Sequence, residues 1–198
     1  MLSRLGPVTS SMDFSLAGGT ALALYLGHRR SVDFDWFTGK RMPDALRLAQ
    51  EVLGHGIPLK VKQVDQGTLH ASVSGVRTAF FEYRYPTLKA PVPLKSHGCL
   101  VASLDDIACM KLSAIAQRGT KRDFVDVFAL LEAHSTLDRM LALYKQKYST
   151  ADVLHVLQAL AYFDDADAQR MPRMLWNVEW PVIKDRIRRA TRRLAQKM

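Results

Sequence analysis

Residues 16–37, LAGGTALALYLGHRRSVDFDWF, constrain the fold of this chain more than any other stretch. Two adjacent glycines, Gly18 and Gly19, precede the run TALALYLG, which predicts a loop that enters a short helix with Thr20 near its start. The segment SVDFDWF alternates and is rich in aromatic residues, so it predicts a strand. A glycine turn, a helix and an acidic strand are therefore expected in immediate succession.

The expected strand carries two carboxylates, Asp33 and Asp35, at alternate positions. Alternate side chains share one face of a strand, with Cα atoms roughly 7 Å apart. Carboxylates that converge from this spacing can hold Mg²⁺, which prefers oxygen ligands together with substrate phosphates. Two alternatives remain open at this point, because the pair can also line a solvent face or form ion pairs with Arg29 and Arg30.

The glycines ahead of this pair favour a phosphate site. Glycine lets the backbone approach a phosphate, and a helix N-terminus presents unpaired N–H groups to it. A tight turn without any ligand is the alternative, so the phosphate interpretation depends on GGT preceding DFD in the same segment. Glu82, in the run FFEYRY, is the candidate for a third acid on a neighbouring strand.

The rest of the chain divides into an α/β half and a helical half. A helix is expected over residues 42–53, and the runs LKVKQVD, TLHASVSG and VRTAFFEYRYP predict antiparallel strands joined by tight turns. From Ser103 onward the pattern is helical and ends in a basic helix over residues 180–196. We therefore predict an α+β chain with an α/β core over residues 1–95 and a helical region over residues 96–198.

The bulk composition limits the classes of partner. The 198 residues are 48% hydrophobic, which suits a globular protein with one sizeable core, and the net charge of +9 favours polyanionic partners such as nucleic acid. No apolar run approaches the roughly 20 residues that span a bilayer. The two cysteines form no CxxC pair. We expect a cytoplasmic protein with no membrane partner.

Two motifs resemble a known family. Residues 16–37 resemble the first motif of the nucleotidyltransferase superfamily, and more narrowly that of its AbiEii/AbiGii-type toxin branch, in which an arginine, a small hydroxyl residue and DxD follow GGT. Residues 111–130, KLSAIAQRGTKRDFVDVFAL, resemble the helical motif of the same branch. The resemblance implies a nucleotidyltransferase-like mixed β-sheet with flanking helices, followed by a C-terminal helical region that completes the active-site cleft.

The resemblance also implies roles for individual residues. The implied metal ligands are Asp33, Asp35 and Glu82, and all three are implied to be catalytic. Lys111 is implied to neutralise the triphosphate, and Asp123 is implied to be the acid of the second motif, with Asp126 as the alternative. The implied nucleotide-binding residues are Gly18, Gly19, Thr20, Arg30, Ser31 and Lys111. Without the resemblance, the alternative is that Lys111 and Asp123 are ordinary surface charges on helices, and that Arg122 and Asp126 form an i,i+4 ion pair.

Together these features predict a Mg²⁺-dependent nucleotidyltransferase that moves a nucleotide from an NTP to an acceptor. The resemblance implies an RNA acceptor such as tRNA, and the positive charge of the chain does not choose RNA over a protein acceptor. By the same resemblance we expect it to be the toxin of a toxin–antitoxin pair, with a cognate antitoxin as partner. A non-catalytic nucleotide- or RNA-binding module is the first alternative, and a metal-dependent nuclease is the second. The basic helix over residues 180–196 either presents a solvated side or contacts RNA or an acidic protein.

Overall fold

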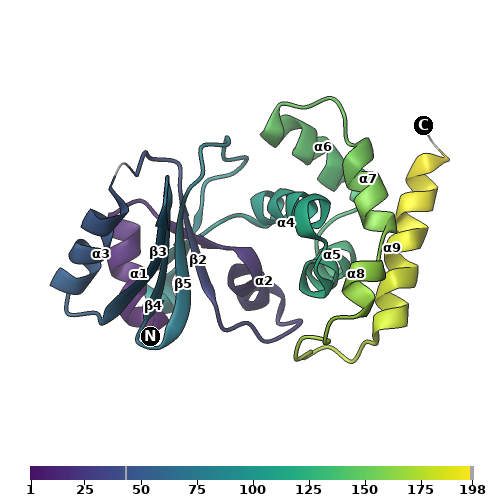
Figure 1. Cartoon of the computed structure of the whole chain (residues 1–198). Coiled ribbons are helices and arrows are strands. Elements are labelled where there is room, and N and C mark those ends of the chain that lie inside the picture. Colours follow the sequence, from purple (N-terminus) through teal and green to yellow (C-terminus); the bar gives the residue numbers. More distant parts are fainter. Residues whose placement is uncertain (43, 197–198) are drawn as a thin grey trace. The chain divides into compact units, whose positions relative to one another are not determined.

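The structure is a computed structural model of the chain that describes residues 1–42 and 44–196. It forms two compact units (Figure 1). The first contains Met1–Ala21 and Ser31–Ser103, and the second contains Leu22–Arg30 and the described residues from Leu104 onward. Within the described residues, no helix is long and apolar enough to cross a membrane.

The first unit is built on a mixed seven-stranded sheet in the order β3-β4-β5-β2-β1-β7-β6. Strands β1 and β7 pair in parallel, as do β2 and β5, whereas the other neighbours are antiparallel. The strands are β1 (Ser15–Ala17), β2 (Phe34–Thr38), β3 (Leu59–Asp65), β4 (Thr68–Val73), β5 (Val76–Glu82), β6 (Val92–Leu94) and β7 (Cys99–Val101). The predicted antiparallel run is confirmed, and the predicted acidic strand is confirmed in part, because β2 begins at Phe34 and therefore contains Asp35 but not Asp33.

Helices α1 (Leu2–Ser11) and α3 (Ala45–Gly54) lie on the same side of this sheet (Figure 1). A short 3₁₀ helix, η1 (Lys95–His97), joins β6 to β7. The middle strands present a row of fully buried apolar side chains to one face, in register from Leu69 through Phe80 and Trp36 to Leu16. Because paired residues of adjacent strands point to the same side, Asp35 must point to the opposite face, next to Ala17 and Ala79.

Helix α2 (Gly18–Leu26) follows β1 without an intervening loop. The helix predicted after the glycines is therefore confirmed, but it begins at the first glycine rather than after the second. Helix α2 starts in the first unit and ends in the second. This placement puts the amino end of α2 beside the carboxylate-bearing face of β2, because Ala17 pairs with Asp35.

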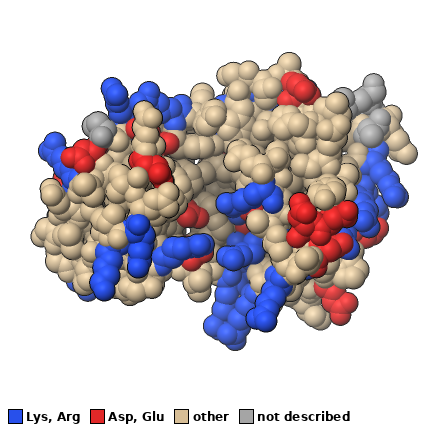
Figure 2. Space-filling view, viewed as in Figure 1, with Lys and Arg blue, Asp and Glu red and all other residues tan. Residues whose placement is uncertain are grey.

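The second unit is helical, as predicted, and α4 contacts α5, α6 and α7, while α9 also contacts these last three helices. Its helices, besides the end of α2, are α4 (Leu104–Arg118), α5 (Lys121–Ala133), α6 (Leu137–Tyr148), α7 (Leu154–Ala161), α8 (Asp164–Asp167) and α9 (Trp180–Ala195). Ile183 and Ile187 of α9 are completely buried, whereas Ala190 and Leu194 on the same side of the helix are half-buried. Lys and Arg side chains gather along the edge of the molecule where α9 lies (Figure 2).

Candidate functional site

The amino end of α2 is shaped around a carboxylate. Gly18 has a φ of +63°, a left-handed conformation that favours glycine. A Cβ added at Gly18 would lie 2.7 Å from Oδ2 of Asp35, which is closer than real Cβ atoms approach other heavy atoms. A glycine is therefore required here twice, for the backbone conformation and for the close approach of the Asp35 carboxylate.

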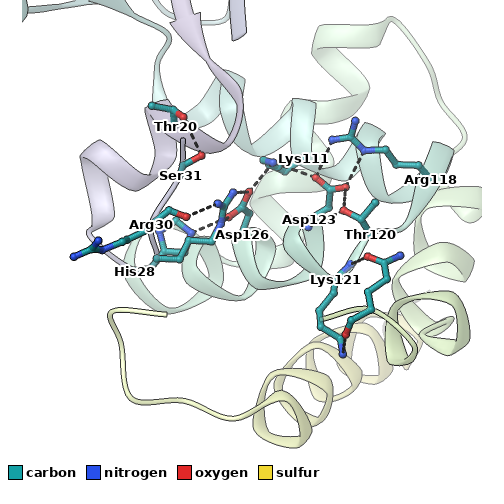
Figure 3. A network of polar contacts seen from close by, with 12 residues as sticks. Thr20, His28, Arg30, Ser31, Lys111, Arg118, Thr120, Lys121, Asp123 and Asp126 are labelled. Carbon is teal, nitrogen blue, oxygen red and sulfur yellow. Dashed lines mark hydrogen bonds and ion pairs between the residues drawn. The ribbon is translucent and has the colours of Figure 1, made fainter. Parts of the chain in front are cut away.

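Thr20 connects this helix to the segment that carries Asp33. Its hydroxyl donates to the carbonyl oxygen of Asp33, and its Oγ1 lies 2.9 Å from Oγ of Ser31 (Figure 3). Thr20 is only 7% exposed. The structure therefore uses the Thr20 and Ser31 hydroxyls to hold the chain between α2 and β2 in place, so that the first carboxylate has a fixed position.

Asp33 precedes β2 directly, and its carboxylate forms an ion pair with Arg77 of β5. Arg77 and Ala79 are alternate residues of β5 and share one face, and Ala79 pairs with Asp35. Asp33 and Asp35 thus both lie against the same face of β5. Among the described residues, Arg77 and Ala79 of β5 lie beside the two aspartates, and neither of them can supply a third carboxylate.

The structure does not place Glu82 with the other two acids. Glu82 pairs with Thr38 and therefore shares the face of buried Trp36, opposite to Asp35. Its carboxylate accepts a hydrogen bond of 2.7 Å from the Met42 N–H and forms an ion pair of 2.6 Å with Arg84. These contacts hold the pKa of Glu82 below its usual value. This register does not bring Glu82 together with Asp33 and Asp35, so its role as a metal ligand and a catalytic acid stays a prediction that this placement does not support.

Instead, Glu82 lines a cavity of about 460 Å³ on the other side of the sheet, together with residues of α3 and of the β3–β4 turn. Within residues 1–42 and 44–196, no three His, Cys, Asp or Glu side chains gather into a metal-binding group. The carboxylate pair Asp33 and Asp35 therefore stands without a third acid among the described residues.

In the second unit, Asp126 of α5 is the centre of a buried ionic cluster (Figure 3). Its Oδ2 lies 2.6 Å from Lys111 Nζ and 2.9 Å from Arg29 Nη2. Its Oδ1 lies 2.7 Å from Arg29 Nε and 2.8 Å from His28 Nε2. Arg29 is thus bound in a bidentate manner, the geometry that suits a guanidinium and a carboxylate best. The cluster joins α4, α5 and the segment after α2.

Asp123, one turn earlier on α5, shares Lys111 with this cluster at 3.1 Å. Its carboxylate also receives Arg118 Nε at 3.0 Å and the hydroxyl of Thr120 at 2.6 Å. Thr120 is the N-cap of α5 and accepts a hydrogen bond from the Asp123 N–H. Asp123 therefore fastens the end of α4 to the start of α5.

The titration behaviour of this cluster follows from burial and charge. Burial alone would raise the pKa of Asp123, but Lys111, Arg118 and Thr120 outweigh it and lower this pKa to about 2. The same balance, with Lys111, His28 and Arg29 as partners, holds the pKa of Asp126 far below its usual range. Burial would lower the pKa of Lys111, but the two carboxylates raise it. All three groups are therefore charged at neutral pH.

Comparison with known proteins decides the family. Residues 1–96 and 75–193 match the family described as "Nucleotidyl transferase AbiEii toxin, Type IV TA system". The chain belongs to the AbiEii family. Its enzyme class is accordingly that of a nucleotidyltransferase, and the predicted resemblance to this toxin branch is confirmed.

Relatives of this AbiEii family member share its sequence or its fold. An uncharacterized protein of Aquifex aeolicus (strain VF5), aq_aa25, is 40% identical over 161 residues, which is 78% of this chain and 75% of the relative. JHP933 from Helicobacter pylori has the same fold with a TM-score of 0.61 and 16% identity, over 98% of this chain and 88% of that one. MenT4, a nucleotidyltransferase toxin from Mycobacterium tuberculosis H37Rv, has a TM-score of 0.56 and 16% identity, over 98% and 81% of the two chains.

The other residues that the family resemblance implied have these positions in the AbiEii chain. Lys111 is only 6% exposed, because it lies between Asp123 and Asp126. Arg30 is exposed, and its N–H donates to the carbonyl of Arg173 at 2.8 Å. The structure gives Asp126, the weaker alternative at first, at least as many ionic partners as Asp123.

The sequence prediction missed Arg77, His28 and the bidentate role of Arg29. Arg77 meets Asp33 across 44 residues of sequence, and only the pairing of β2 with β5 shows it. His28 and Arg29 contact α5 across nearly 100 residues. The one available signal was the basic run HRR, which ends two residues before DFD and indicated that charged partners were needed without identifying them.

Proposed function

We propose that this chain transfers a nucleotide from an NTP to an RNA acceptor in a Mg²⁺-dependent reaction, and that a cognate antitoxin counteracts this activity. The observation that supports it most is the Asp35 carboxylate held against Gly18 at the amino end of α2. A metal-binding carboxylate and a phosphate-binding helix N-terminus are here adjacent in one short segment. This is the arrangement that a metal–triphosphate substrate requires.

The donor set suits Mg²⁺. Asp33 and Asp35 offer carboxylate oxygens, the ligands that this hard cation prefers, and few protein ligands are needed because Mg²⁺ keeps waters and binds substrate phosphates. When bound, the ion supplies positive charge to the phosphates of the NTP. Arg77, which is 72% exposed at its side chain, balances Asp33 in the chain alone.

The residues around the acids bind and position the substrate. The first N–H groups of α2 have no partner within the helix and point toward its amino end, where they can donate to phosphate oxygens. Gly18 and Gly19 put no side chain in the way of this approach. Thr20 and Ser31 hold the Asp33 backbone. Catalysis of this type consists mainly of positioning and charge stabilisation.

In the proposed reaction, an acceptor hydroxyl forms a bond to the α-phosphorus of the NTP while the α–β phosphoanhydride bond breaks. Pyrophosphate leaves, and the hydroxyl proton is released. RNA is the acceptor that the net charge of +9 favours. Arg192 and Arg193 of α9 are exposed and available to an RNA backbone, whereas Arg186 forms an ion pair of 2.5 Å with Glu132.

Lys111, Asp123 and Asp126 act in this proposal as positioning residues. Their mutual ion pairs leave Lys111 enclosed by carboxylates, and Arg29 is bound by Asp126 directly before the segment that leads to Asp33. The charge of Lys111 thus serves first to keep two buried acids ionised. Loss of any member leaves an unpaired buried charge, which is costly.

The test is a transfer assay with the full chain, Mg²⁺, total RNA and NTPs labelled at the α-phosphate. We expect labelled RNA on a denaturing gel, and we expect no label with EDTA or with Asp35→Asn. Asp65→Asn is the matched control, because Asp65 is an exposed acid at the end of β3 and its substitution should leave transfer intact. Absence of labelled RNA would refute an RNA acceptor, and shortened RNA would instead support a nuclease.

A further inference from the structure

A row of aromatic side chains continues the carboxylate-bearing face of the sheet. The aromatic row consists of His70, Phe81, Phe37, Tyr83 and Tyr85. Phe37 follows Asp35 by two positions on β2 and therefore lies on the same face of the strand. Phe81 pairs with Phe37 across β5, and their rings stack with centroids 4.9 Å apart.

The other members extend this stack in both directions. The His70 ring contacts the Phe81 ring edge-on with centroids 5.8 Å apart, and Tyr83 contacts Phe37 at 5.5 Å. Tyr85 continues from Tyr83 at 4.9 Å. Five rings thus follow one another at intervals close to the size of one aromatic ring.

These rings are not part of the core. Trp36 and Phe80, the neighbouring aromatics on the opposite face, are completely buried. Phe37, Phe81 and Tyr83 are half-buried, and Tyr85 is 51% exposed. Exposed aromatic rings in a contiguous group are unusual on a surface without a binding role.

Positive charge accompanies the row. Lys89 is exposed and follows Tyr85 by four residues, whereas Arg84 pairs with Glu82 on the opposite side of the sheet and is not part of this charge. At the other end of the same sheet face, Lys60 is in register with Ser72 and, through it, with Arg77. Aromatic rings flanked by cations are the features with which proteins bind single-stranded nucleic acid, since bases stack on the rings and phosphates meet the cations.

We propose that the aromatic row is a binding platform for the unpaired nucleotides of an RNA acceptor. One nucleobase covers one or two rings, so a row of five rings fits a strand of several nucleotides rather than the base of a single NTP. A duplex keeps its base faces stacked internally, so the rings select unpaired nucleotides. The inference rests on the proposed function for calling this RNA the acceptor, but the binding itself requires neither NTP nor Mg²⁺.

The test measures binding of the full chain to a fluorescein-labelled, unstructured oligoribonucleotide of about 12 nucleotides by fluorescence anisotropy, without NTP or metal. Stacking on one ring contributes about 1–3 kcal/mol, so Tyr85→Ala should weaken binding by about fivefold or more. Tyr85→Phe keeps the ring and should bind as the wild type does. Tyr162→Ala removes a similarly exposed ring, 54% exposed, from the second unit and should also leave binding unchanged.

Phe37→Leu is the second variant, since it keeps an apolar side chain and removes the ring next to Asp35. We expect a loss similar to that of Tyr85→Ala at unchanged melting temperature, and weaker binding of a blunt RNA hairpin than of the single strand. Wild-type binding by Tyr85→Ala, equal binding of the hairpin, or no RNA binding by the wild type would overturn the platform. The transfer assay distinguishes the two proposals. If the chain transfers nucleotide but Tyr85→Ala binds RNA as the wild type does, only the platform is refuted. If RNA binding depends on the rings but no nucleotide is transferred, only the proposed function is refuted.

Discussion

Substitution of Gly18 by alanine can distinguish an effect on the reaction from an effect on folding, because the chain contains a matched control position, Gly27. Gly18 and Gly27 have φ values of +63° and +60°, and they lie at opposite ends of α2. A Cβ at Gly27 meets no atom within 4 Å, whereas a Cβ at Gly18 lies 2.7 Å from Asp35 Oδ2. Substitution by alanine therefore imposes the same backbone strain at both sites and a steric conflict at only one.

The magnitudes follow from these numbers. The left-handed conformation destabilises the folded state by about 1–2 kcal/mol when alanine replaces glycine. The same replacement lowers the entropy of the unfolded chain, which stabilises the fold by about 0.4–1 kcal/mol. Each variant should thus lose about 1 kcal/mol of unfolding free energy, a melting-temperature decrease of about 2–4 °C for a chain of this length. In Gly18→Ala the carboxylate oxygen must also retreat from 2.7 Å to the 3.4 Å of an ordinary contact.

This displacement moves the carboxylate of Asp35, a proposed metal ligand, and leaves the backbone in place, so it should lower the rate of nucleotide transfer. A misplacement of about 1 Å in a catalytic site costs on the order of 100-fold in rate. We expect Gly18→Ala to transfer nucleotide at least about tenfold more slowly than Gly27→Ala, with similar melting temperatures. Equal transfer rates for the two variants, per folded molecule, would refute the role of the Gly18–Asp35 contact.

Three further predictions concern the charged residues. Asp126→Asn should reduce the free energy of unfolding by about 3–5 kcal/mol in denaturant titrations, because it leaves buried Lys111 and Arg29 without their shared carboxylate. Glu82→Gln should leave the rate of nucleotide transfer unchanged, since Glu82 lies on the opposite face from Asp35; a large loss of rate would restore it as a catalytic acid. The pKa of Asp123 falls from 3.8 to about 2 on folding, so Asp123 contributes about 2 kcal/mol to the free energy of unfolding above pH 4, and this contribution is lost as the pH falls through 2. When the free energy of unfolding is measured against pH, Asp123→Asn should therefore lose less stability in acid than the wild type does.

The local part of the site could be predicted from sequence. The glycines, the helix and the acidic strand of residues 16–37 are consecutive, and their patterns are short-range, so the structure confirms a helix, α2, followed by a strand, β2; strand β1 before the glycines was not predicted. The N-terminal helix α1 was not predicted. It contains Pro7, which is unfavourable within a helix, and it is held by buried side chains such as Leu5 and Val8 that contact the rest of the first unit.

The long-range part could not be predicted. A change of one residue in strand register moves a side chain to the other face of a sheet, so composition alone could not decide whether Glu82 joins Asp35. Its pairing with Thr38 decides this. Likewise, Asp123 and Asp126 are one helical turn apart on α5, and sequence alone could not show that His28 and Arg29 contact Asp126 whereas Arg118 contacts Asp123.

The central claim is that Asp33 and Asp35 support transfer of a nucleotide, not of a phosphate. The most direct measurement supplies the chain with Mg²⁺ and RNA, using either α-labelled or γ-labelled NTP in parallel reactions. We predict that the α-label enters RNA, that the γ-label appears only in pyrophosphate, and that both signals disappear in Asp35→Asn. Transfer of the γ-label to RNA, or undiminished α-label transfer in Asp35→Asn, would contradict it.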